Sequence, residues 1–211
     1  MSRPKVYIDG KEGTTGLQIY DRLAAREDID LLLIGEEKRK DPSERKKFLN
    51  EADLVFLCLP DAAAVEAVGL IENGRTRVID CSTAHRTAEG WAYGFPELSG
   101  QREAVKAAAR VANPGCYATG FLSLVRPLVE KGALSPKARL TCHALSGYTG
   151  AGKKAVAQYT DPDRAEELES PRHYAVTLSH KHLPEMAAVA GLDRPPLFTP
   201  MTCDYPQGMV V

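Results

Sequence analysis

Short apolar runs alternate with helical spacings in the first half of the chain. Residues 10–16 form a glycine-rich turn after the first run, and Leu17, Tyr20, Leu23 and Ala24 then recur at helical spacing. An alanine-rich helix is expected over residues 62–73. Strands that alternate with helices predict a parallel sheet. The predicted strands of this half are residues 5–9, 29–34, 54–59, 76–80 and 110–112.

The pattern changes at residues 113–116, which precede an apolar-periodic helix through Leu122 and Leu128. Beyond that helix we expect an α+β arrangement with a glycine loop at residues 147–152 and a short helix after Pro184. The domain boundary is therefore predicted between residues 114 and 115. The chain stops at Val211 within a strand-like stretch, so we expect the second domain to be cut short at its C-terminal side. The predicted strands of this half are residues 138–145, 174–178, 197–201 and 209–211.

The first glycine turn has the features of a phosphate-binding loop. Gly10, Gly13 and Gly16 recur every third residue, directly after a strand and before a helix. A close backbone approach and the N–H groups of a helix N-terminus suit a pyrophosphate, although a simple turn between strand and helix is the alternative. After the second strand, residues 38–40 are all basic, which favours the 2′-phosphate of NADP, or else forms a solvated charge run.

Cys116 has the features of a nucleophile. Gly115 permits a sharp turn, and the helix that follows offers its positive end to a thiolate and its N–H groups to an oxyanion. A buried structural cysteine is the alternative. A base is available in residues 180–185, because His180 and His182 are two residues apart and an extended segment places such a pair on the same side. The same pair resembles half of a metal site, but the sequence lacks clear further ligands, so no metal is expected.

Two more segments carry candidate binding residues. Arg86 follows the fourth predicted strand, at the edge where open α/β sheets place ligands, and its guanidinium suits a phosphate or carboxylate. A surface arginine is the alternative. Residues 146–153 form a second glycine-rich loop, which is either a long turn or a segment that packs against a cofactor.

Composition narrows the function classes. The 211 residues carry 27 Lys and Arg against 28 Asp and Glu, and this balance argues against nucleic acid as the main partner. The longest apolar run, residues 54–59, is far shorter than the roughly 20 residues that cross a bilayer, so no membrane span is expected. The N-terminus has no features of a secretion signal, and the five widely spaced cysteines do not suggest disulfides. We expect a cytoplasmic location.

Taken together, five stretches resemble the type 2 branch of the N-acetyl-gamma-glutamyl-phosphate reductase family, within the semialdehyde dehydrogenase superfamily. The resemblance covers residues 5–211, and its Pro-Gly-Cys-Tyr and His-Lys-His-x-Pro-Glu elements are specific. Ala118 stands where many members carry proline, and members continue well past Val211. The stretches are residues 8–17, 80–86, 91–98, 113–119, and 146–153 together with 180–185.

The resemblance implies a fold, a reaction and a set of site residues. The fold is α/β, with a Rossmann-like NADP-binding domain over residues 1–114 and an α+β catalytic domain over residues 115–211. The reaction is the NADPH-dependent reduction of N-acetyl-gamma-glutamyl phosphate to the semialdehyde, a step of arginine biosynthesis. Cys116 forms a thioester, His180, chosen over His182, is general acid and base, and Arg86 holds the substrate phosphate. The implied NADP-binding residues are Gly10, Gly13, Thr14, Thr15, Gly16, Ser82, Ser146, Gly147 and Gly150.

Two alternatives stay open, and the expected partners are few. One alternative is an enzyme similar to aspartate-semialdehyde dehydrogenase, and the other is a truncated NADP-binding module without catalysis. We expect a small-molecule substrate and a homo-oligomer.

Overall fold

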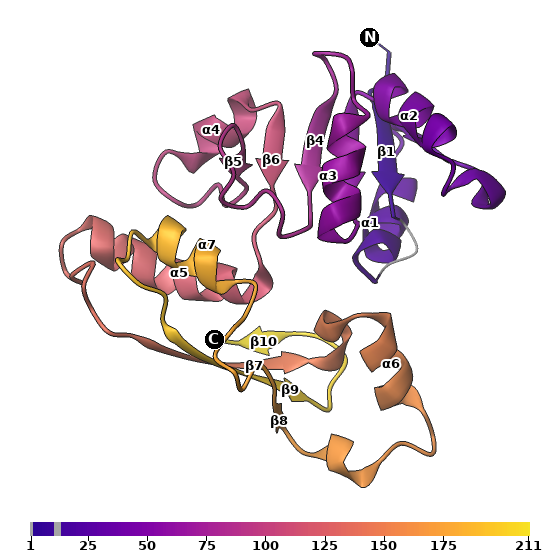
Figure 1. Ribbon diagram of the computed structural model, residues 1–211. Helices are drawn as coiled ribbons and strands as arrows, with labels where there is room; N and C mark the ends of the chain where they lie inside the picture. The colour runs from indigo at the N-terminus through magenta and orange to yellow at the C-terminus, as the bar shows by residue number, and fades with distance from the viewer. Residues whose placement is uncertain (1, 11–13) are drawn as a thin grey trace. The chain divides into compact units, whose positions relative to one another are not determined.

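The computed structural model describes residues 2–10 and 14–211, with the backbone alone for residues 14–17. It contains two compact units, Met1–Pro114 and Gly115–Val211. Figure 1 labels many of the elements of each unit. All the helices in the described part of the chain are too short or too polar to span a membrane.

The first unit is built on a six-stranded parallel sheet with the strand order β2-β1-β3-β4-β6-β5. The order reverses between β1 and β3, because the chain passes from β1 to β2 on one side and continues from β3 on the other. Ligands of open α/β sheets bind outside the carboxyl ends of the strands at such a reversal. The strands are β1 Lys5–Asp9, β2 Asp30–Leu32, β3 Leu54–Leu57, β4 Arg77–Asp80, β5 Ala92–Tyr93 and β6 Arg110–Ala112.

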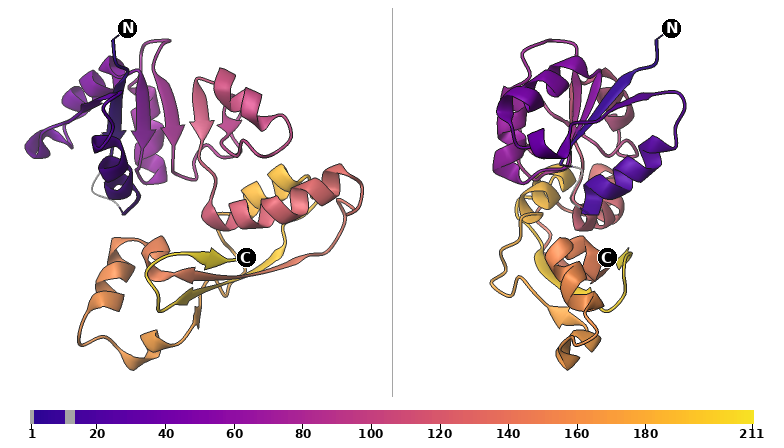
Figure 2. Two further views of the ribbon diagram at one scale, coloured as in Figure 1. Left: turned by 180° about the vertical axis from the view of Figure 1, so that it is seen from behind. Right: turned by 90° about the vertical axis from the view of Figure 1, so that its right-hand side faces the viewer.

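Helices cover both faces of this sheet, with α1 on one face and α2 and α3 on the other (Figure 2). The elements are α1 Thr14–Ala24, the 3-10 helix η1 Glu36–Lys38, α2 Pro42–Glu51, α3 Asp61–Gly69 and α4 Gln101–Ala107.

The start of α2 is fixed by a side-chain cap. Asp41 accepts hydrogen bonds from the backbone N–H groups of Ser43 at 2.8 Å and Glu44 at 3.4 Å.

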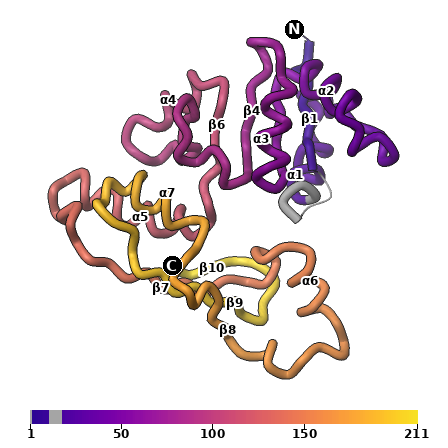
Figure 3. Tube along the Cα trace, in the orientation of Figure 1, coloured from indigo at the N-terminus to yellow at the C-terminus, as the bar shows by residue number. Residues whose placement is uncertain are grey.

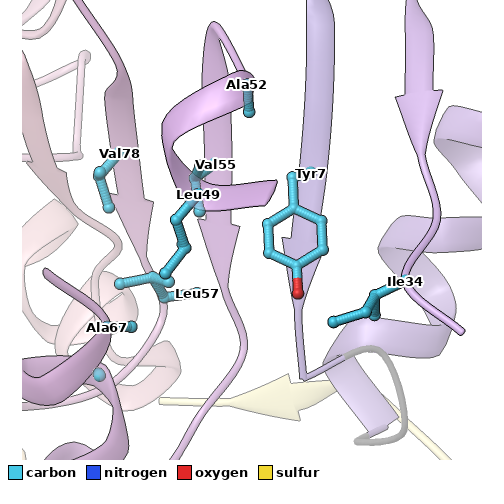
Figure 4. Close-up of a cluster of buried hydrophobic side chains, with 9 residues drawn as sticks. Tyr7, Ile34, Leu49, Ala52, Val55, Leu57, Ala67 and Val78 are labelled. Carbon is cyan, nitrogen blue, oxygen red and sulfur yellow. The ribbon is translucent and has the colours of Figure 1, made fainter. Parts of the chain in front are cut away.

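The core of the first unit lies between the sheet and helices α2 and α3 (Figure 4). The strands of a covered parallel sheet are buried on both faces, which is why they are continuous apolar runs in the sequence. This packing fixes the carboxyl ends of β1, β3 and β4 at one edge. The buried cluster consists of Tyr7, Ile34, Leu49, Ala52, Val55, Leu57, Ala64, Ala67 and Val78.

The second unit combines helices with a four-stranded mixed sheet of order β10-β7-β9-β8, in which β7 and β9 are parallel. Figure 3 traces the chain from α5 into β7, out through α6 and back through α7 into β9. The elements are α5 Cys116–Glu130, β7 Thr141–Gly147, η2 Tyr148–Ala151, α6 Lys153–Thr160, η3 Glu166–Glu169, β8 Arg172–His173, α7 Leu183–Ala190, β9 Leu197–Cys203 and β10 Met209–Val210.

The strand predicted over residues 174–178 was wrong. Strand β8 ends at His173, and the backbone then turns with positive φ angles of 54° at Ala175 and 59° at Leu178. Those angles lie outside the extended region, so the segment cannot continue the ladder. Residues 146 and 147, predicted to begin a loop, are instead the last two residues of β7.

Candidate active site

Cys116 is the first residue of α5 and is exposed. Gly115 precedes it in an extended conformation, and the first intrahelical bond runs from Thr119 N–H to Gly115 O at 2.8 Å. Tyr117 and Ala118, the next two residues, are buried and anchor the first turn. The thiol is therefore held at the positive end of the helix, beside first-turn amides that make no intrahelical bond.

Glu185 ties the start of α5 to the histidine segment, a contact that the sequence did not predict. Its carboxylate Oε2 accepts a hydrogen bond from Gly115 N–H at 3.1 Å, and the side chain is only 1% exposed. Glu185 lies in the first turn of α7, which begins directly after His182. The turn before Cys116 is thus fixed from the helix that follows the two histidines. The signal available in the sequence was the Glu of the quoted His-Lys-His-x-Pro-Glu element.

His180 and His182 lie around the ring of Tyr117, the neighbour of Cys116. Their ring centroids are 5.8 and 5.7 Å from that of Tyr117, and 4.7 Å from each other. His182 is buried, whereas His180 is half-buried. The backbone N–H of His182 donates to Nδ1 of His180 at 3.1 Å. A ring nitrogen that accepts a hydrogen bond carries no proton, so neutral His180 holds its proton on Nε2.

The hydroxyl group of Tyr117 is hydrogen-bonded to two other hydroxyl groups, those of Ser146 and Tyr174. The hydroxyls of Tyr117 and Ser146 lie 2.6 Å apart, and the Tyr174 hydroxyl donates to that of Tyr117 at 2.6 Å. Burial raises the pKa of Tyr117, so its phenol stays protonated at neutral pH. Ser146, predicted to bind the cofactor, is buried and is engaged with Tyr117 in this structure.

Gly147 and Gly150, the other two residues of the second glycine loop that are predicted to bind the cofactor, differ in how closely other atoms surround them. A Cβ on Gly147 would lie 2.7 Å from the backbone of Gln207, so glycine is required there for the close approach of two chain segments. Gly150 lies in η2 with nothing within 4 Å of a Cβ.

The first glycine turn lies at the reversal of strand order in the first unit. Gly10 has a φ of +89°, and a Cβ there would collide with the carbonyl oxygen of Cys58 at the end of β3. Thr14, Thr15 and Gly16 form the first turn of α1. Gly13 lies outside the described residues. A backbone that must be glycine, followed by a helix N-terminus, fits the pyrophosphate of a dinucleotide.

A polar cluster follows β4 at the same sheet edge. Asp80 is fully buried, and its Oδ2 lies 2.6 Å from both Ser82 Oγ and His85 Nδ1. The His85 ring stacks on Trp91 with centroids 4.0 Å apart. Arg86 donates from Nε to Asn113 O at 3.0 Å and from Nη2 to Cys81 O at 3.4 Å. The structure therefore fixes the Arg86 guanidinium between the ends of β4 and β6.

Across residues 2–10 and 14–211, no three His, Cys, Asp or Glu side chains gather into a group that could hold a metal ion.

Family models match both units. Residues 5–108 match a model described as semialdehyde dehydrogenase, NAD binding domain, and residues 116–211 match the semialdehyde dehydrogenase dimerisation domain. An N-acetyl-gamma-glutamyl-phosphate reductase of Trichormus variabilis is 49% identical over 100% of this chain and 67% of its own length. The chain belongs to the N-acetyl-gamma-glutamyl-phosphate reductase family. A reductase of Chelativorans sp. is 50% identical over 98% of this chain and 66% of its own length.

Solved structures show the same fold. Aspartate semialdehyde dehydrogenase II of Vibrio cholerae, complexed with ASA, has a TM-score of 0.67 at 13% identity and covers 99% of this chain and 73% of its own. The enzyme of Candida albicans with NADP has a TM-score of 0.62 at 12% identity, over 99% of this chain and 70% of its own. The predicted resemblance and the predicted fold class are both confirmed, and the chain spans about two thirds of the reductases that it matches.

Membership of this reductase family makes the chain an oxidoreductase of the semialdehyde dehydrogenase superfamily with a nicotinamide-cofactor domain. The match to the NAD binding domain includes the Gly10 turn, the start of α1 and Arg86. These are the residues that the structure gathers at one sheet edge.

Proposed function

We propose that this chain catalyses the NADPH-dependent reduction of N-acetyl-gamma-glutamyl phosphate to N-acetylglutamate semialdehyde and phosphate, with Cys116 as the nucleophile. The observation that carries the proposal is the bond from Gly115 N–H to Glu185, which joins the turn before Cys116 to the histidine segment. The names of the relatives supply the substrate.

The first chemical step belongs to Cys116. Its thiolate attacks the acyl carbon, the carbon–oxygen bond to phosphate breaks, and a thioester forms on the sulfur while phosphate leaves. The thiol is exposed, so solvent can take its proton. The first-turn N–H groups of α5 stabilise the oxygen of the attacked carbonyl as negative charge develops there. The reducing equivalents that convert the thioester to the aldehyde come from NADPH when it is bound.

The tautomer of His180 narrows its role. Nδ1 of His180 accepts a hydrogen bond from the backbone N–H of His182, so the proton of the neutral ring is on Nε2. His180 can therefore donate this proton to an oxygen of the reacting group. We therefore assign His180 the acid half of the acid–base role implied by the family. A glutamine amide at position 180 preserves an N–H donor at a similar distance from the backbone, whereas alanine removes it. Loss of one such donor costs roughly 100-fold to 1,000-fold in kcat.

The residues that would hold the dinucleotide are the Gly10 turn and the first turn of α1, formed by Thr14, Thr15 and Gly16. NADP is preferred over NAD for two reasons. The first is that residues 38–40 are all basic, which suits a 2′-phosphate. The second is that the Glu36 carboxylate forms an ion pair with Arg39 at 3.4 Å, whereas an acidic side chain that hydrogen-bonds the ribose 2′-hydroxyl would favour NAD. Gly13, Ser82, Ser146, Gly147 and Gly150 complete the proposed cofactor contacts.

Arg86 is proposed to bind the substrate phosphate. Bonds to the backbone oxygens of Asn113 and Cys81 hold the guanidinium in place, and a guanidinium suits a phosphate in a fork geometry. Lysine cannot reproduce that fork.

We also propose that the chain forms a homo-oligomer through the second unit, which matches the dimerisation model. Val176 and Val210, which are 77% and 65% exposed, are apolar side chains that an interface would cover. Light scattering on the purified chain measures the oligomeric state directly. The cytoplasmic location stays a prediction.

The test is the reverse reaction, with N-acetylglutamate semialdehyde, phosphate and NADP⁺, followed by absorbance of the reduced cofactor. We expect turnover that needs phosphate, exceeds turnover with aspartate semialdehyde and is faster with NADP⁺ than with NAD⁺. The Cys116→Ser variant should be inactive, and Cys142→Ala, which removes a buried thiol, should retain turnover. Equal rates with both semialdehydes would refute the assigned substrate.

A further inference from the structure

Two cysteines of the first unit lie side by side at the ends of neighbouring strands, and neither has a part in the proposed reaction. Cys58 follows β3 directly, and Cys81 follows β4 directly. The last register pair of these strands is Leu57 with Asp80, and the bond from Cys81 N–H to Leu57 O at 2.9 Å belongs to that pair. Cys58 and Cys81 are the residues directly after this last pair, one on each strand, and a side-chain hydrogen bond joins their thiols.

The backbone geometry at this pair suits a disulfide. Cys58 and Cys81 each directly follow a residue of the same register pair, and neighbouring strands lie about 4.8 Å apart. Disulfides span Cα separations of roughly 4.4–6.8 Å. Both residues are partly exposed, whereas Cys142 and Cys203 are buried, and this difference favours oxidation of the first pair.

We propose that Cys58 and Cys81 are a redox-active thiol pair that closes to a reversible disulfide when the protein meets hydrogen peroxide. The Cys81 thiolate attacks one oxygen of the peroxide, the O–O bond breaks, hydroxide leaves and a sulfenic acid forms on Cys81. The Cys58 thiol loses its proton, and its sulfur displaces hydroxide from Cys81 to form the S–S bond. In sum, one peroxide and two thiols give one disulfide and two waters.

The surroundings decide which sulfur attacks first. The pKa of Cys81 is lowered, chiefly by the hydrogen bond that Cys58 donates to its sulfur, with a further contribution from the charge of Arg86. The pKa of Cys58 is raised by the same bond and by burial. The thiolate is the reactive form of cysteine, so Cys81 is the attacking residue and Cys58 the resolving one.

The pair lies between two proposed binding elements. The carbonyl oxygen of Cys58 is the group that excludes a Cβ at Gly10, and the carbonyl of Cys81 accepts a bond from Arg86. The thiol pair itself is inferred from strand register and burial, so it stands whether or not the proposed reaction is right.

The experiment uses the full chain carrying Cys116→Ser, which removes the exposed nucleophile and leaves four of the five cysteines. Hydrogen peroxide is added in limited excess, and remaining thiols are counted with a chromogenic disulfide reagent. We expect two of the four thiols to disappear, the intact mass to fall by two hydrogen atoms, and dithiothreitol to reverse both changes. Peptide mapping should place the new bond between Cys58 and Cys81.

Single substitutions in the same background assign the roles. With Cys58→Ser, the Cys81 sulfenic acid cannot be resolved, so dimedone should label Cys81. With Cys81→Ser, Cys58 should stay reduced over the time in which the parent chain loses both thiols. The proposal fails if the parent chain forms no disulfide, if mapping links Cys142 or Cys203 instead, or if Cys58 oxidises at the same rate without Cys81. Peptide mapping on the Cys116→Ser chain needs neither the Cys58 nor the Cys81 substitution. The mapping result therefore decides the proposal even if one of these variants fails to fold.

Discussion

Gly10→Ala tests the turn on which the proposed dinucleotide site rests. Gly10 has a φ of +89°, and a Cβ there would lie 2.9 Å from both the carbonyl carbon of Cys58 and the Cδ2 atom of Leu59. The left-handed conformation costs a non-glycine residue about 1–2 kcal/mol. Overpacking against backbone that cannot move aside costs about 1–3 kcal/mol more. We therefore expect a loss of roughly 2–5 kcal/mol in the free energy of unfolding.

Gly90→Ala is the matched control. Gly90 has a similar φ of +79°, but nothing lies within 4 Å of a Cβ built there, so only the conformational cost applies. Both glycines belong to the first unit, and so does Trp91, the single tryptophan of the chain. Urea unfolding followed by tryptophan fluorescence therefore reports on the unit that carries both substitutions. Equal losses in the two variants would show that the Gly10 backbone does not approach Cys58 closely, and would refute the reasoning.

Three further results are expected. Burial raises the pKa of Cys142 from 9.0 to about 11. At pH 8 its thiolate fraction, and with it the rate of iodoacetamide labelling, should therefore be about 100-fold below that of an unperturbed cysteine. Labelling at the rate of an unperturbed cysteine would contradict its burial. Glu185→Ala removes the acceptor of the Gly115 N–H bond, and we expect kcat to fall by a larger factor than KM changes. Glu185→Gln keeps an acceptor oxygen, so its loss of kcat should be smaller. Equal losses of kcat in the two variants would show that the bond does not position Cys116. Arg86→Lys should raise the KM for phosphate about 10-fold or more in the reverse assay, with thermal melting as the control for folding, and an unchanged KM would remove Arg86 from the phosphate site.

The central strands of the first unit and the positions of the two proposed chemical centres could be predicted from the sequence for physical reasons. Strands of a covered parallel sheet are buried on both faces, so β1 and β3 appear as apolar runs. Gly10 and Cys116 stand at junctions between an apolar run and a helix, where the residue type has a local cause. The local sequence alone could therefore indicate both positions, although their roles in binding and catalysis stay predictions.

Other parts depended on contacts between distant residues. Helix α2 was not predicted, because Phe48 and Leu49 are its only large apolar residues and no apolar stripe reveals it. Glu185 looks like an ordinary acid in the first turn of a helix, and only its bond to Gly115, 70 residues away, shows why it is buried. The 174–178 segment has the composition of a strand, but its backbone turns at Ala175 and Leu178.

The central claim is that Cys116 carries the acyl group, and intact-mass spectrometry tests it most directly. The chain is mixed with N-acetyl-gamma-glutamyl phosphate without NADPH, quenched in acid and compared with its Cys116→Ser variant. We predict that the parent chain gains one acetylglutamyl group, which peptide mapping places on Cys116 and hydroxylamine removes, and that the variant gains none. Turnover in the Cys116→Ser variant at a near-normal rate, or an acyl group mapped to another residue, would contradict the account.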